Sequence, residues 1–392
     1  MLPLEGIKVV SIEQAVAAPF ASRQLADFGA RVIKIERPNV GDFARGYDEK
    51  VRGMASWFVW LNRSKESLTL DLKHTDAGTI LHKLLEDCDV LIYNLAPGAP
   101  ERLGIGSANL TARYPRLIIC EISGYGSKGP YRDKKAYDLL VQFETGLVSI
   151  TGTPETPSKA GISAADIAAG VYAFSGILLA LRMRDQTGRG TVLQVSLFDA
   201  LGEWMSAAGY YAAYGGSSPR RTRAEHASIA PYGPFATGGG KQVNLGIQNE
   251  REWVEFCSSV LQKPEIATDP RFDTNSRRSD NRDGLRAVIE NVFGTLTAEQ
   301  VLERLDRAGI ANGRMNSVQD FWKHPQHEAR KRWREVKSPV GPLAALLPPM
   351  VLEGIEPRMD PIPALGEHTE AILSELGYTT DQILALRTEH AI

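Results

Sequence analysis

The sequence has few cysteines, almost no excess of either charge, and no long uninterrupted hydrophobic run. Three cysteines, Cys88, Cys120 and Cys257, stand far apart among 392 residues. Such usage is typical of a reducing compartment and argues against disulfides and a zinc cluster. The formal net charge is −2, so there is no overall basic field that would attract nucleic acid.

Signals for membrane insertion and secretion are also missing. No apolar stretch approaches the roughly 18–20 uninterrupted residues of a membrane span, and the opening MLPLEGIKVVSIE lacks the basic and apolar regions of a secretory signal. We therefore expect a soluble cytoplasmic protein with no membrane partner. His324 and His327 are three residues apart, but the intervening proline and the lack of a third ligand favour a surface segment. No metal site is predicted.

The first half of the chain alternates strand and helix patterns. IKVVSIE, PFASRQLADFGA and RVIKIE form a strand–helix–strand unit, and TDAGTILHKLLEDC, DVLIYN and RLIICEIS continue the alternation. This order predicts an α/β fold with a parallel sheet. The first turn, EQAVAAPF, lacks the glycines of a dinucleotide site. Gly124, Gly126 and Gly129 satisfy G-x-G-x-x-G, but Pro130 follows directly, so we interpret them as a mobile loop at a strand end.

One long apolar helix, within Ser163–Gly190, carries a single carboxylate, Asp166, in its first turn. Ser163 lies three residues before it, a spacing that resembles a capping box. Asp166 is either a capping acid that offsets the helix dipole, or a carboxylate kept ionised by free helix N–H groups in an apolar pocket as a nucleophile toward an acyl group. The residues around Asp166 are mostly small, which leaves room for a second molecule.

Charged residues elsewhere allow two interpretations each. Basic side chains at predicted strand ends are either solvated charges or a site for a phosphorylated anion; they are Arg37, Arg63, Lys65 and Arg102. Tyr137 and Asp138 are typical of a helix start with a capping acid and a buried ring. The basic stretch with Arg220, Arg221, Arg223 and His226 is either a flexible tether or a patch for a substrate carboxylate.

Ordered motifs along nearly the whole chain resemble the family III CoA-transferases of the CaiB/BaiF type. They are PLEGIKVVSIE, LADFGARVIKIERP followed by GD, LNRSKESLTLDLK, NLAPGAPERLG, ISGYGSKGP, AYDLLVQFETGLVSITG, ADIAAGVYAFSGILLALRMRDQTGRG and GEHTEAILSELG. The resemblance implies a large Rossmann-like domain built from both chain ends, a smaller α/β domain between them, and an interlocked homodimer. With the composition changes, it predicts residues 1–215 as the first part of the large domain, 216–226 as a linker, 227–325 as the small domain, and 326–392 as the returning segment.

The resemblance also implies roles for individual residues. Asp166 falls where relatives have the acyl-accepting nucleophile. The loop of Gln14, Ala15, Val16 and Ala17 should line the active site, although relatives have histidine or glutamine where this chain has Gln14 and Val16. Residues that fall where relatives contact coenzyme A are Arg37, Asn94, Arg102, Lys135 and Tyr137. Coenzyme A thioesters are expected as substrates, with no tightly bound cofactor.

The expected reaction transfers coenzyme A from an acyl-CoA donor to a small carboxylic acid through an aspartyl anhydride. RRTRAEHASIAPYGPF is most similar to relatives that use succinyl-CoA and dicarboxylates such as itaconate, mesaconate, malate, citramalate or glutarate. A second carboxylate needs a cation, for which Arg220, Arg223 and His226 are candidates. The alternatives are a 2-methylacyl-CoA racemase, which should have a His-Asp pair where this chain has Tyr137-Asp138, and a non-catalytic protein that binds coenzyme A.

Overall fold

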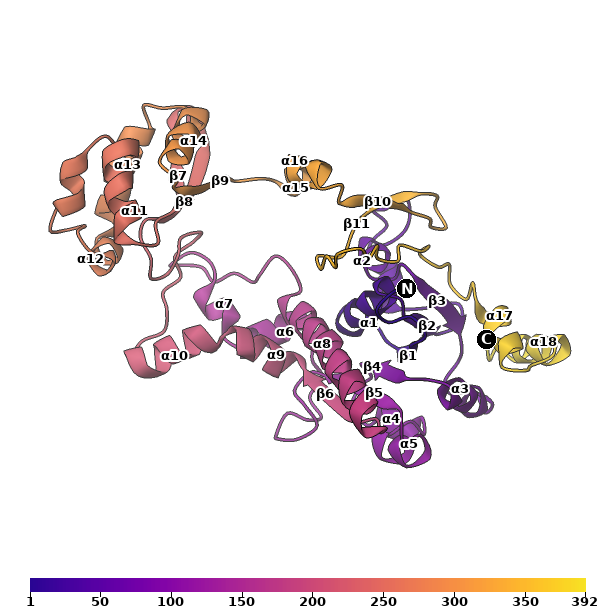
Figure 1. Cartoon of the computed structure of the whole chain (residues 1–392). Helices are drawn as coiled ribbons and strands as arrows, with labels where there is room; N and C mark the ends of the chain where they lie inside the picture. The colour runs from indigo at the N-terminus through magenta and orange to yellow at the C-terminus, as the bar shows by residue number, and fades with distance from the viewer. The chain divides into compact units, whose positions relative to one another are not determined.

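The computed structural model describes all 392 residues, and the chain divides into two compact units. The first unit comprises Met1–Leu147, Ala160–Ala207 and His327–Ile392, and the second comprises Val148–Lys159 and Ala208–Gln326. The first unit therefore contains both ends of the chain, indigo and yellow in Figure 1. Residues 148–159, predicted within the large domain, pack with the second unit instead.

A six-stranded parallel sheet forms the centre of the first unit. Its strand order is β3-β2-β1-β4-β5-β6, the order of doubly wound dinucleotide-binding folds. The strands are β1 (Lys8–Ile12), β2 (Arg31–Glu36), β3 (Lys65–Thr69), β4 (Val90–Tyr93), β5 (Ile118–Ser123) and β6 (Val192–Ser196). Because β1 pairs with β2 on one side and with β4 on the other, the chain changes winding direction between β1 and β4. The predicted α/β class with a parallel sheet is confirmed.

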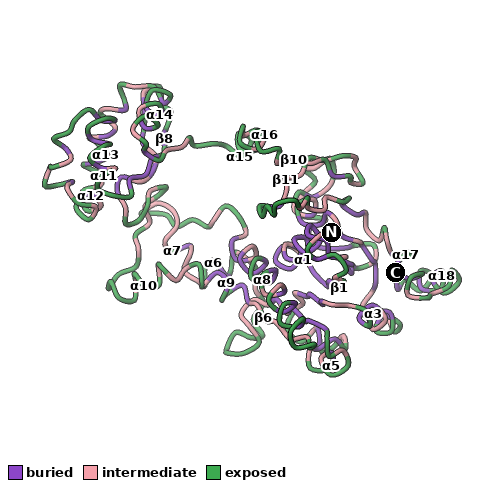
Figure 2. Tube along the Cα trace, viewed as in Figure 1, coloured by how far each residue is buried: buried purple, intermediate pink, exposed green.

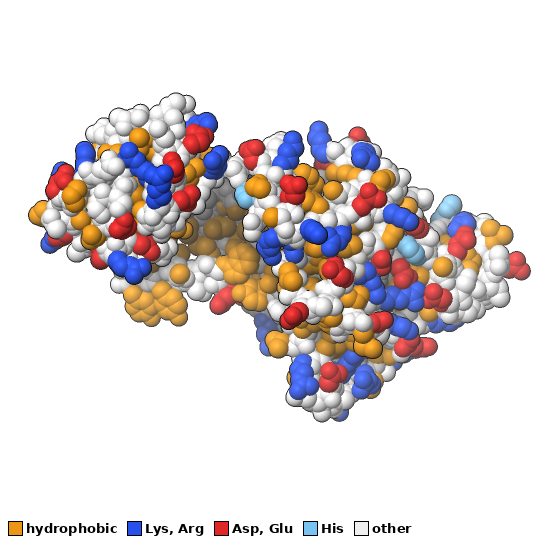
Figure 3. Space-filling model, turned by 45° about the horizontal axis from the view of Figure 1, so that its top comes forward, with side chains coloured by type: hydrophobic (Ala, Val, Ile, Leu, Met, Phe, Trp, Pro, Cys, Tyr) orange, Lys and Arg blue, Asp and Glu red, His pale blue; other side chains and the backbone are white.

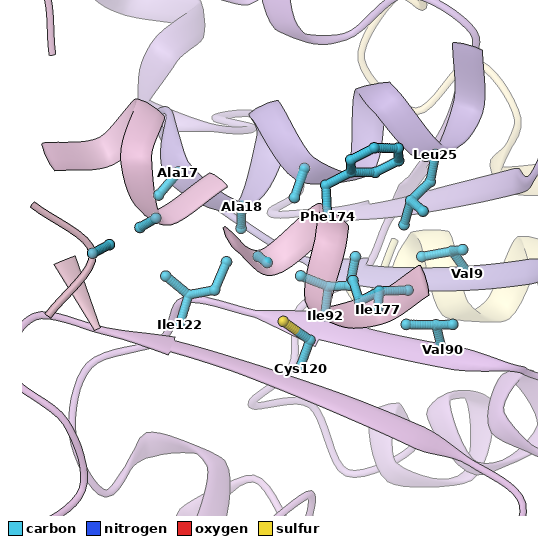
Figure 4. Packing of buried hydrophobic residues seen from close by; sticks show 14 of the residues in the cluster. Val9, Ala17, Ala18, Leu25, Val90, Ile92, Cys120, Ile122, Phe174 and Ile177 are labelled. Atoms are coloured by element: carbon cyan, nitrogen blue, oxygen red, sulfur yellow. The ribbon is translucent and has the colours of Figure 1, made fainter. Parts of the chain in front are cut away.

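Alternate side chains of the strands other than β3 enter two cores, one on either face of the sheet. Val9 of β1 packs with helices α1 (Ala17–Asp27) and α8 (Ala164–Thr187), and the close-up in Figure 4 shows this packing. Val10 points the other way, toward α3 (Ala77–Glu86) and α5 (Ser107–Arg113). Cys120 is fully buried in the first core, and burial raises the pKa of its thiol. It is a small core residue, as expected.

Helix α8 is the longest element and the main cover of one sheet face. Its first turn holds Asp166, and it ends at Gly188, whose left-handed conformation (φ 73°) suits a C-terminal glycine. In length and composition it could cross a membrane, but the core helix of a globular protein meets the same criteria, and 56% of its most apolar window is buried. Figure 2 shows buried residues along α8 and α1.

Shorter elements complete the first unit. A two-stranded antiparallel sheet pairs β10 (Trp333–Val336) with β11 (Leu343–Leu346). The remaining helices of this unit are α2 (Ser56–Leu61), α4 (Ala99–Arg102), α6 (Asp138–Glu144), α9 (Leu197–Trp204), α17 (Thr369–Glu375) and α18 (Thr380–Thr388). Three helices have residues in both units: α7 (Leu147–Ile150), α10 (Ser206–Gly215) and α16 (Pro325–Ala329).

The second unit has its own antiparallel sheet and core. Its strands are β7 (Tyr232–Ala236), β8 (Gln242–Gly246) and β9 (Ala311–Arg314), and its helices are α11 (Glu250–Glu255), α12 (Asn275–Asp280), α13 (Arg282–Phe293), α14 (Ala298–Arg307) and α15 (Val318–Trp322). Gly238–Gly240 lie between the antiparallel strands β7 and β8 and form the turn of this hairpin. On the face in Figure 3, charges of both signs are interspersed.

Two segments differ in structure from what their residue types indicate. TVLQVSLFDA has the apolar pattern of one strand, but β6 ends at Ser196 and α9 begins at Leu197. The Ser196 hydroxyl accepts a hydrogen bond from the Asp199 N–H, so it caps the helix and ends the strand. Residues 265–284 have the charged composition of a loop, but they include α12, capped by Thr274. The high charge of this segment concealed a short surface helix.

Candidate active site

The site begins where β1 and β4 end, at the point where the winding of the sheet reverses. Gln14 follows β1 and Asn94 follows β4. Their groups pair twice, because the Gln14 N–H donates to Asn94 Oδ1 at 2.8 Å and Asn94 Nδ2 donates to the Gln14 carbonyl at 2.8 Å. Ligands of doubly wound sheets bind beyond the carboxyl ends of the strands at this reversal. The amide of Asn94, a predicted coenzyme A contact, is therefore used to hold the loop.

The next residue of this loop adopts a backbone conformation that is uncommon for anything but glycine. Ala15 has φ 63°, in the left-handed region that L-residues disfavour. Its N–H donates to Asp42 Oδ1 at 2.8 Å, and the Phe43 N–H donates to Gln14 Oε1 at 3.1 Å. The loop of residues 14–17 is thus fixed from two sides before α1 begins at Ala17.

Helix α1 lies directly against α8 near Asp166. A Cβ atom on Gly170 would lie 2.8 Å from the Ala17 carbonyl oxygen and 2.9 Å from a ring carbon of Phe20. Gly170 is one helical turn after Asp166, so the two residues lie on the same face of α8. The Asp166 side chain therefore leaves the helix on the side where the loop of residues 14–17 enters α1.

The first turn of α8 is capped by a residue from another helix. Ser163 occupies the N-cap position, but its side chain makes no capping hydrogen bond. Asp138, the first residue of α6, accepts instead from the Ala165 N–H at 2.8 Å and from the Asp166 N–H at 3.2 Å. The predicted capping box is therefore wrong. The spacing of Ser163 and Asp166 suits a capping box, but the Asp138 carboxylate, 27 residues before Ala165, accepts the hydrogen bonds instead.

Burial and this neighbouring carboxylate together change the acidity of Asp166. Burial is the larger cause and Asp138 the smaller, and they raise the pKa of Asp166 to about 7. The expectation that free helix N–H groups keep Asp166 ionised is wrong, because Asp138 accepts two of them. A carboxylate with a pKa near neutrality is a stronger base than an ordinary aspartate, and such shifts gather at functional sites.

The remaining predicted coenzyme A contacts are exposed. Arg37, Arg102 and Lys135 all lie at the surface, and the Arg37 guanidinium lies 4.8 Å from the centre of the Phe43 ring. Tyr137 is the N-cap residue of α6 and is 72% exposed. The interpretation of Tyr137 as a buried ring is therefore wrong, and a ligand can reach the phenol.

Two of the four basic residues considered for an anionic ligand are instead buried in ion pairs. Arg63 donates to both oxygens of Asp27, at 2.8 Å each, and Lys65 Nζ lies 2.7 Å from Glu13 Oε1. These two side chains form their ion pairs inside the first unit. Desolvated ions need partners of opposite charge, so these residues have no free charge for a phosphate. The idea of a four-residue anion site is wrong for Arg63 and Lys65.

The basic stretch before β7 belongs to the second unit, and its members differ in their contacts. Arg221 donates to the carbonyls of Ser149, Thr153 and Pro154, which makes it a structural tie. Arg220 and Arg223 are exposed.

His226 in the same stretch is held by the backbone that follows it. Its Nδ1 accepts from the N–H groups of Ser228 and Ile229, and its ring stacks on Tyr232. An Nδ1 atom that accepts two backbone hydrogen bonds is already occupied and cannot also contact a substrate. The two exposed arginines remain candidates for a substrate carboxylate.

The sequence alone did not assign two residues of this site. Asp42 was noted only as part of a GD pair in the family resemblance, and Asp138 was interpreted as a cap of its own helix. Local spacing identifies acids that cap the helix they belong to. Contacts between distant segments leave no such periodic signal, and both carboxylates act on segments far away along the chain.

The fold and the site define an α/β protein with a partly buried carboxylate next to the reversal point of a parallel sheet. The family model for CoA-transferase family III matches residues 4–369. The chain belongs to this family and is a CoA-transferase that uses coenzyme A thioesters as substrates.

Named relatives cover nearly the full length of the chain. The succinyl-CoA:glutarate CoA-transferase of Mus musculus is 30% identical over 380 residues, 96% of this chain and 87% of its own. The succinyl-CoA–D-citramalate CoA-transferase of Chloroflexus aurantiacus is 30% identical over 401 residues, 100% of this chain and 98% of its own. The crystal structure of a CaiB/BaiF family protein from Brucella suis matches with a TM-score of 0.83 and 32% identity, covering 96% of this chain and 99% of the other.

Proposed function

We propose that Asp166 is the residue that accepts the acyl group during coenzyme A transfer. The observation that carries this proposal is the raised pKa of Asp166, about 7, in the first turn of α8 beside the loop of residues 14–17. At neutral pH a substantial fraction of this carboxylate is ionised, and that fraction is more basic than an ordinary aspartate. The position also matches the nucleophile that the family resemblance implies.

The proposed reaction proceeds by exchanges at the Asp166 carboxyl group. An Asp166 oxygen attacks the thioester carbonyl carbon, the C–S bond breaks, and the thiolate of coenzyme A leaves, so that a mixed anhydride forms. The thiolate then attacks the aspartyl carbonyl of the anhydride, which forms an aspartyl thioester and releases the donor acid. The acceptor carboxylate attacks this thioester, its C–S bond breaks, and a second mixed anhydride and free thiolate form. The thiolate finally attacks the acceptor acyl carbon, which gives the new acyl-CoA and releases Asp166 as a free carboxylate.

The proposed donor is succinyl-CoA and the proposed acceptor is a small dicarboxylate. Support comes from the relatives of Mus musculus and Chloroflexus aurantiacus, whose names specify succinyl-CoA with glutarate and with D-citramalate. Arg220 and Arg223 are exposed cations that can pair with a second carboxylate. His226 is a weaker candidate because its Nδ1 already accepts two hydrogen bonds.

Two copies of the chain are proposed to form the enzyme, in the cytoplasm. Helix α10 buries none of its residues, and its Tyr210, Tyr211 and Tyr214 are 68%, 51% and 86% exposed. Figure 2 shows α10 as largely exposed. An apolar helix with no cover within its own chain is typical of an interface, and a second copy is the occupant that the family resemblance implies.

A racemase reaction is the second candidate in the same fold. It needs two bases that remove and return a proton beside the thioester carbonyl. Tyr137 stands where a histidine is expected, and both oxygens of Asp138 already accept hydrogen bonds, from the first turn of α8 and from Gln142. These contacts favour transfer over proton exchange.

The test of the proposed nucleophile is the pair of variants Asp166→Asn and Asp166→Ala. Each should lower the rate of transfer from succinyl-CoA to glutarate to less than a few per cent of the wild-type rate, while the affinity for coenzyme A stays within about threefold by calorimetry. Hydroxylamine added during turnover should mark Asp166 in the wild type, as detected by mass spectrometry. Activity retained in either variant, or a mark on another residue, contradicts the proposal.

The same assay decides the acceptor and the reaction class. A panel of mono- and dicarboxylates with succinyl-CoA should show a clear preference for dicarboxylates, and a preference for monocarboxylates rejects that part of the proposal. Deuterium incorporation beside the thioester carbonyl of a 2-methylacyl-CoA, without transfer to any acid, would establish the racemase instead.

A further inference from the structure

The feature that leads beyond the nucleophile is the strained loop residue Ala15 and the carboxylate that holds it. Ala15 has φ 63°, and its N–H donates to Asp42 Oδ1 at 2.8 Å. The same oxygen accepts from the Ala44 N–H at 2.9 Å, at the start of a short helical turn. Asp42 is 1% exposed. A strained conformation persists only where its surroundings enforce it, and such positions gather at functional sites.

Asp42 is itself fixed to the sheet by a buried cation. Its Oδ2 lies 2.5 Å from Lys34 Nζ, and the same ammonium lies 3.3 Å from Glu13 Oε1. Lys34 belongs to β2 and Glu13 directly follows β1, and both side chains are 0% exposed. The acceptor for the Ala15 N–H is therefore rigidly connected to the two strands that lead into the site. Asn94, which directly follows β4, holds Gln14, the residue before Ala15.

The loop held in this way leads into α1, which packs against α8, the helix that carries the proposed nucleophile. After Ala15 the chain enters α1 at Ala17, whose carbonyl oxygen lies against Gly170 of α8. Burial raises the pKa of the Tyr47 phenol, and the nearby charges of Asp42 and Asp166 add to this effect. Both Asp42 oxygens are occupied by groups of the protein.

We propose that Asp42 is a positioning residue of the transfer reaction, which fixes Ala15 in its left-handed conformation and thereby sets the loop of residues 14–17 against the first turns of α8. The inference rests on the proposed role of Asp166. Asp42 does not touch the substrate. It determines the position of the loop of residues 14–17 when the thioester carbonyl approaches Asp166. A displacement of about 1 Å in such a positioning element can lower a rate about a hundredfold.

The test is a double-mutant cycle between Asp42 and Ala15. Asp42→Ala should lower kcat for transfer from succinyl-CoA to glutarate by about 10- to 100-fold, with KM for succinyl-CoA changed by less than about threefold. Ala15→Gly alone loosens the loop of residues 14–17 and should lower kcat by less than Asp42→Ala does. Because glycine adopts positive φ without steric cost, the double variant should regain at least about fivefold in kcat over Asp42→Ala.

Asp48 provides the matched control in the same segment. Its carboxylate caps the start of α2 by accepting from Ser56, and it has no hydrogen bond to the loop of residues 14–17. Asp48→Ala should keep kcat within about threefold of the wild type. Asp42→Asn retains an acceptor oxygen for Ala15 and Ala44. We expect it to stay within about tenfold of the wild type, as a conservative replacement. If the alanine variant does not fold, Asp42→Ser replaces it in the cycle, because the serine side chain is too short to accept from both Ala15 and Ala44.

Additive effects of the Asp42 and Ala15 substitutions overturn the proposal, because a purely structural loss is not relieved by glycine at position 15. A fall in thermal stability without a fall in kcat of the folded fraction overturns it as well. Failure of the proposed function itself has a different signature. If Asp166 is not the nucleophile, hydroxylamine does not mark Asp166 in the wild type. If only the proposal for Asp42 is wrong, hydroxylamine marks Asp166 in the wild type, but the coupling between positions 15 and 42 is missing.

Discussion

At the scale of single residues, the arrangement of two acids decides what Asp166 can do. Asp138 accepts hydrogen bonds from two N–H groups at the start of α8. Asp166 therefore lies beside a second carboxylate and is not stabilised by those N–H groups. Burial and this neighbour raise the pKa of Asp166 to about 7. The folded protein therefore holds a poorly solvated acid at the place where the chemistry is proposed. A poorly solvated acid lowers the stability of the folded protein, and such a loss is common at active sites.

The pH dependence of transfer follows from these two causes. The wild-type rate should rise with pH between about 6 and 8, as Asp166 ionises, and then level off. Asp138→Asn removes the neighbouring charge but keeps an oxygen for the N–H groups, so the rising limb should move to lower pH. It should stay above the ordinary range of aspartate, because burial remains. The measurement is kcat against pH for both proteins, and an unmoved limb contradicts the assignment.

Stability provides a check that does not depend on activity. Asp166 binds its proton more tightly in the folded than in the unfolded chain, so its own contribution to stability falls as pH rises from about 4 to 7 and changes no further above that. Asp166→Asn should therefore stabilise the protein at pH 8, by on the order of a few kcal/mol, and have little effect at pH 4. Thermal unfolding at the two pH values measures this, and an equal effect at both would show that the pKa is not raised.

At the scale of elements, the close contact of α1 and α8 connects the loop to the nucleophile. Gly170 allows the approach because it has no Cβ atom. The neighbouring atom is the Ala17 carbonyl oxygen, which belongs to the backbone and cannot swing aside. Small residues of α8, including Ala165, Ala169 and Ala173, are fully buried at this side of the sheet. The sequence ADIAAGVYA thus permits close packing that larger side chains would prevent.

Gly170→Ala should separate the two helices and disturb the site. We expect a loss of about 1–3 kcal/mol in the free energy of unfolding, which is typical of overpacked cores, together with a lower kcat. Gly202→Ala in α9 is the matched control, because a Cβ there meets nothing within 4 Å. Alanine at that half-buried helix position, where a Cβ has room, should be neutral or stabilising. Equal effects of the two substitutions in denaturant titrations and transfer assays would refute this role of Gly170.

At the scale of the whole molecule, segments far apart in the sequence complete the first unit. The C-terminal helices α17 and α18 add to the core on the face of the sheet opposite α8. The Thr369 hydroxyl accepts a hydrogen bond from the Thr69 N–H of β3, 300 residues earlier. The second unit folds around a separate core. Such a chain cannot be shortened at its C-terminal end without exposing apolar surface of the sheet.

The exposed helix α10 should be buried between two copies of the chain. The wild type should be dimeric by light scattering, and the double substitution Tyr210→Lys with Tyr214→Lys should raise the dimer dissociation constant at least tenfold. Leu384→Lys is the control, because Leu384 is 60% exposed on α18 and carries no such role. A monomeric wild type rejects the dimer, and an unchanged constant in the double variant rejects α10 as part of the interface.

Local patterns predicted much of the fold. RVIKIE coincides with β2, residue for residue, because β-branched residues filled a buried strand with turn signals at both ends. LTAEQVLERLDRAG has the apolar spacing of a helix and contains α14, whose Thr297 and Gln300 form a capping box. Both elements are determined by contacts within a few residues. The interpretation of Arg63 as a ligand contact failed because its partner, Asp27, is 36 residues away.

By itself the sequence determined the alternation of strands and helices, the family, and the placing of one acid at the head of an apolar helix. Those features depend on residue type and periodicity, which can be read along the chain. The tertiary structure alone decided that Asp138 caps that helix, that Asp166 has a pKa near 7, and that Lys34, Lys65 and Arg63 are buried partners of acids. Acidity and ion pairing depend on burial and on charges brought together across the fold, so they exist only once the chain has folded.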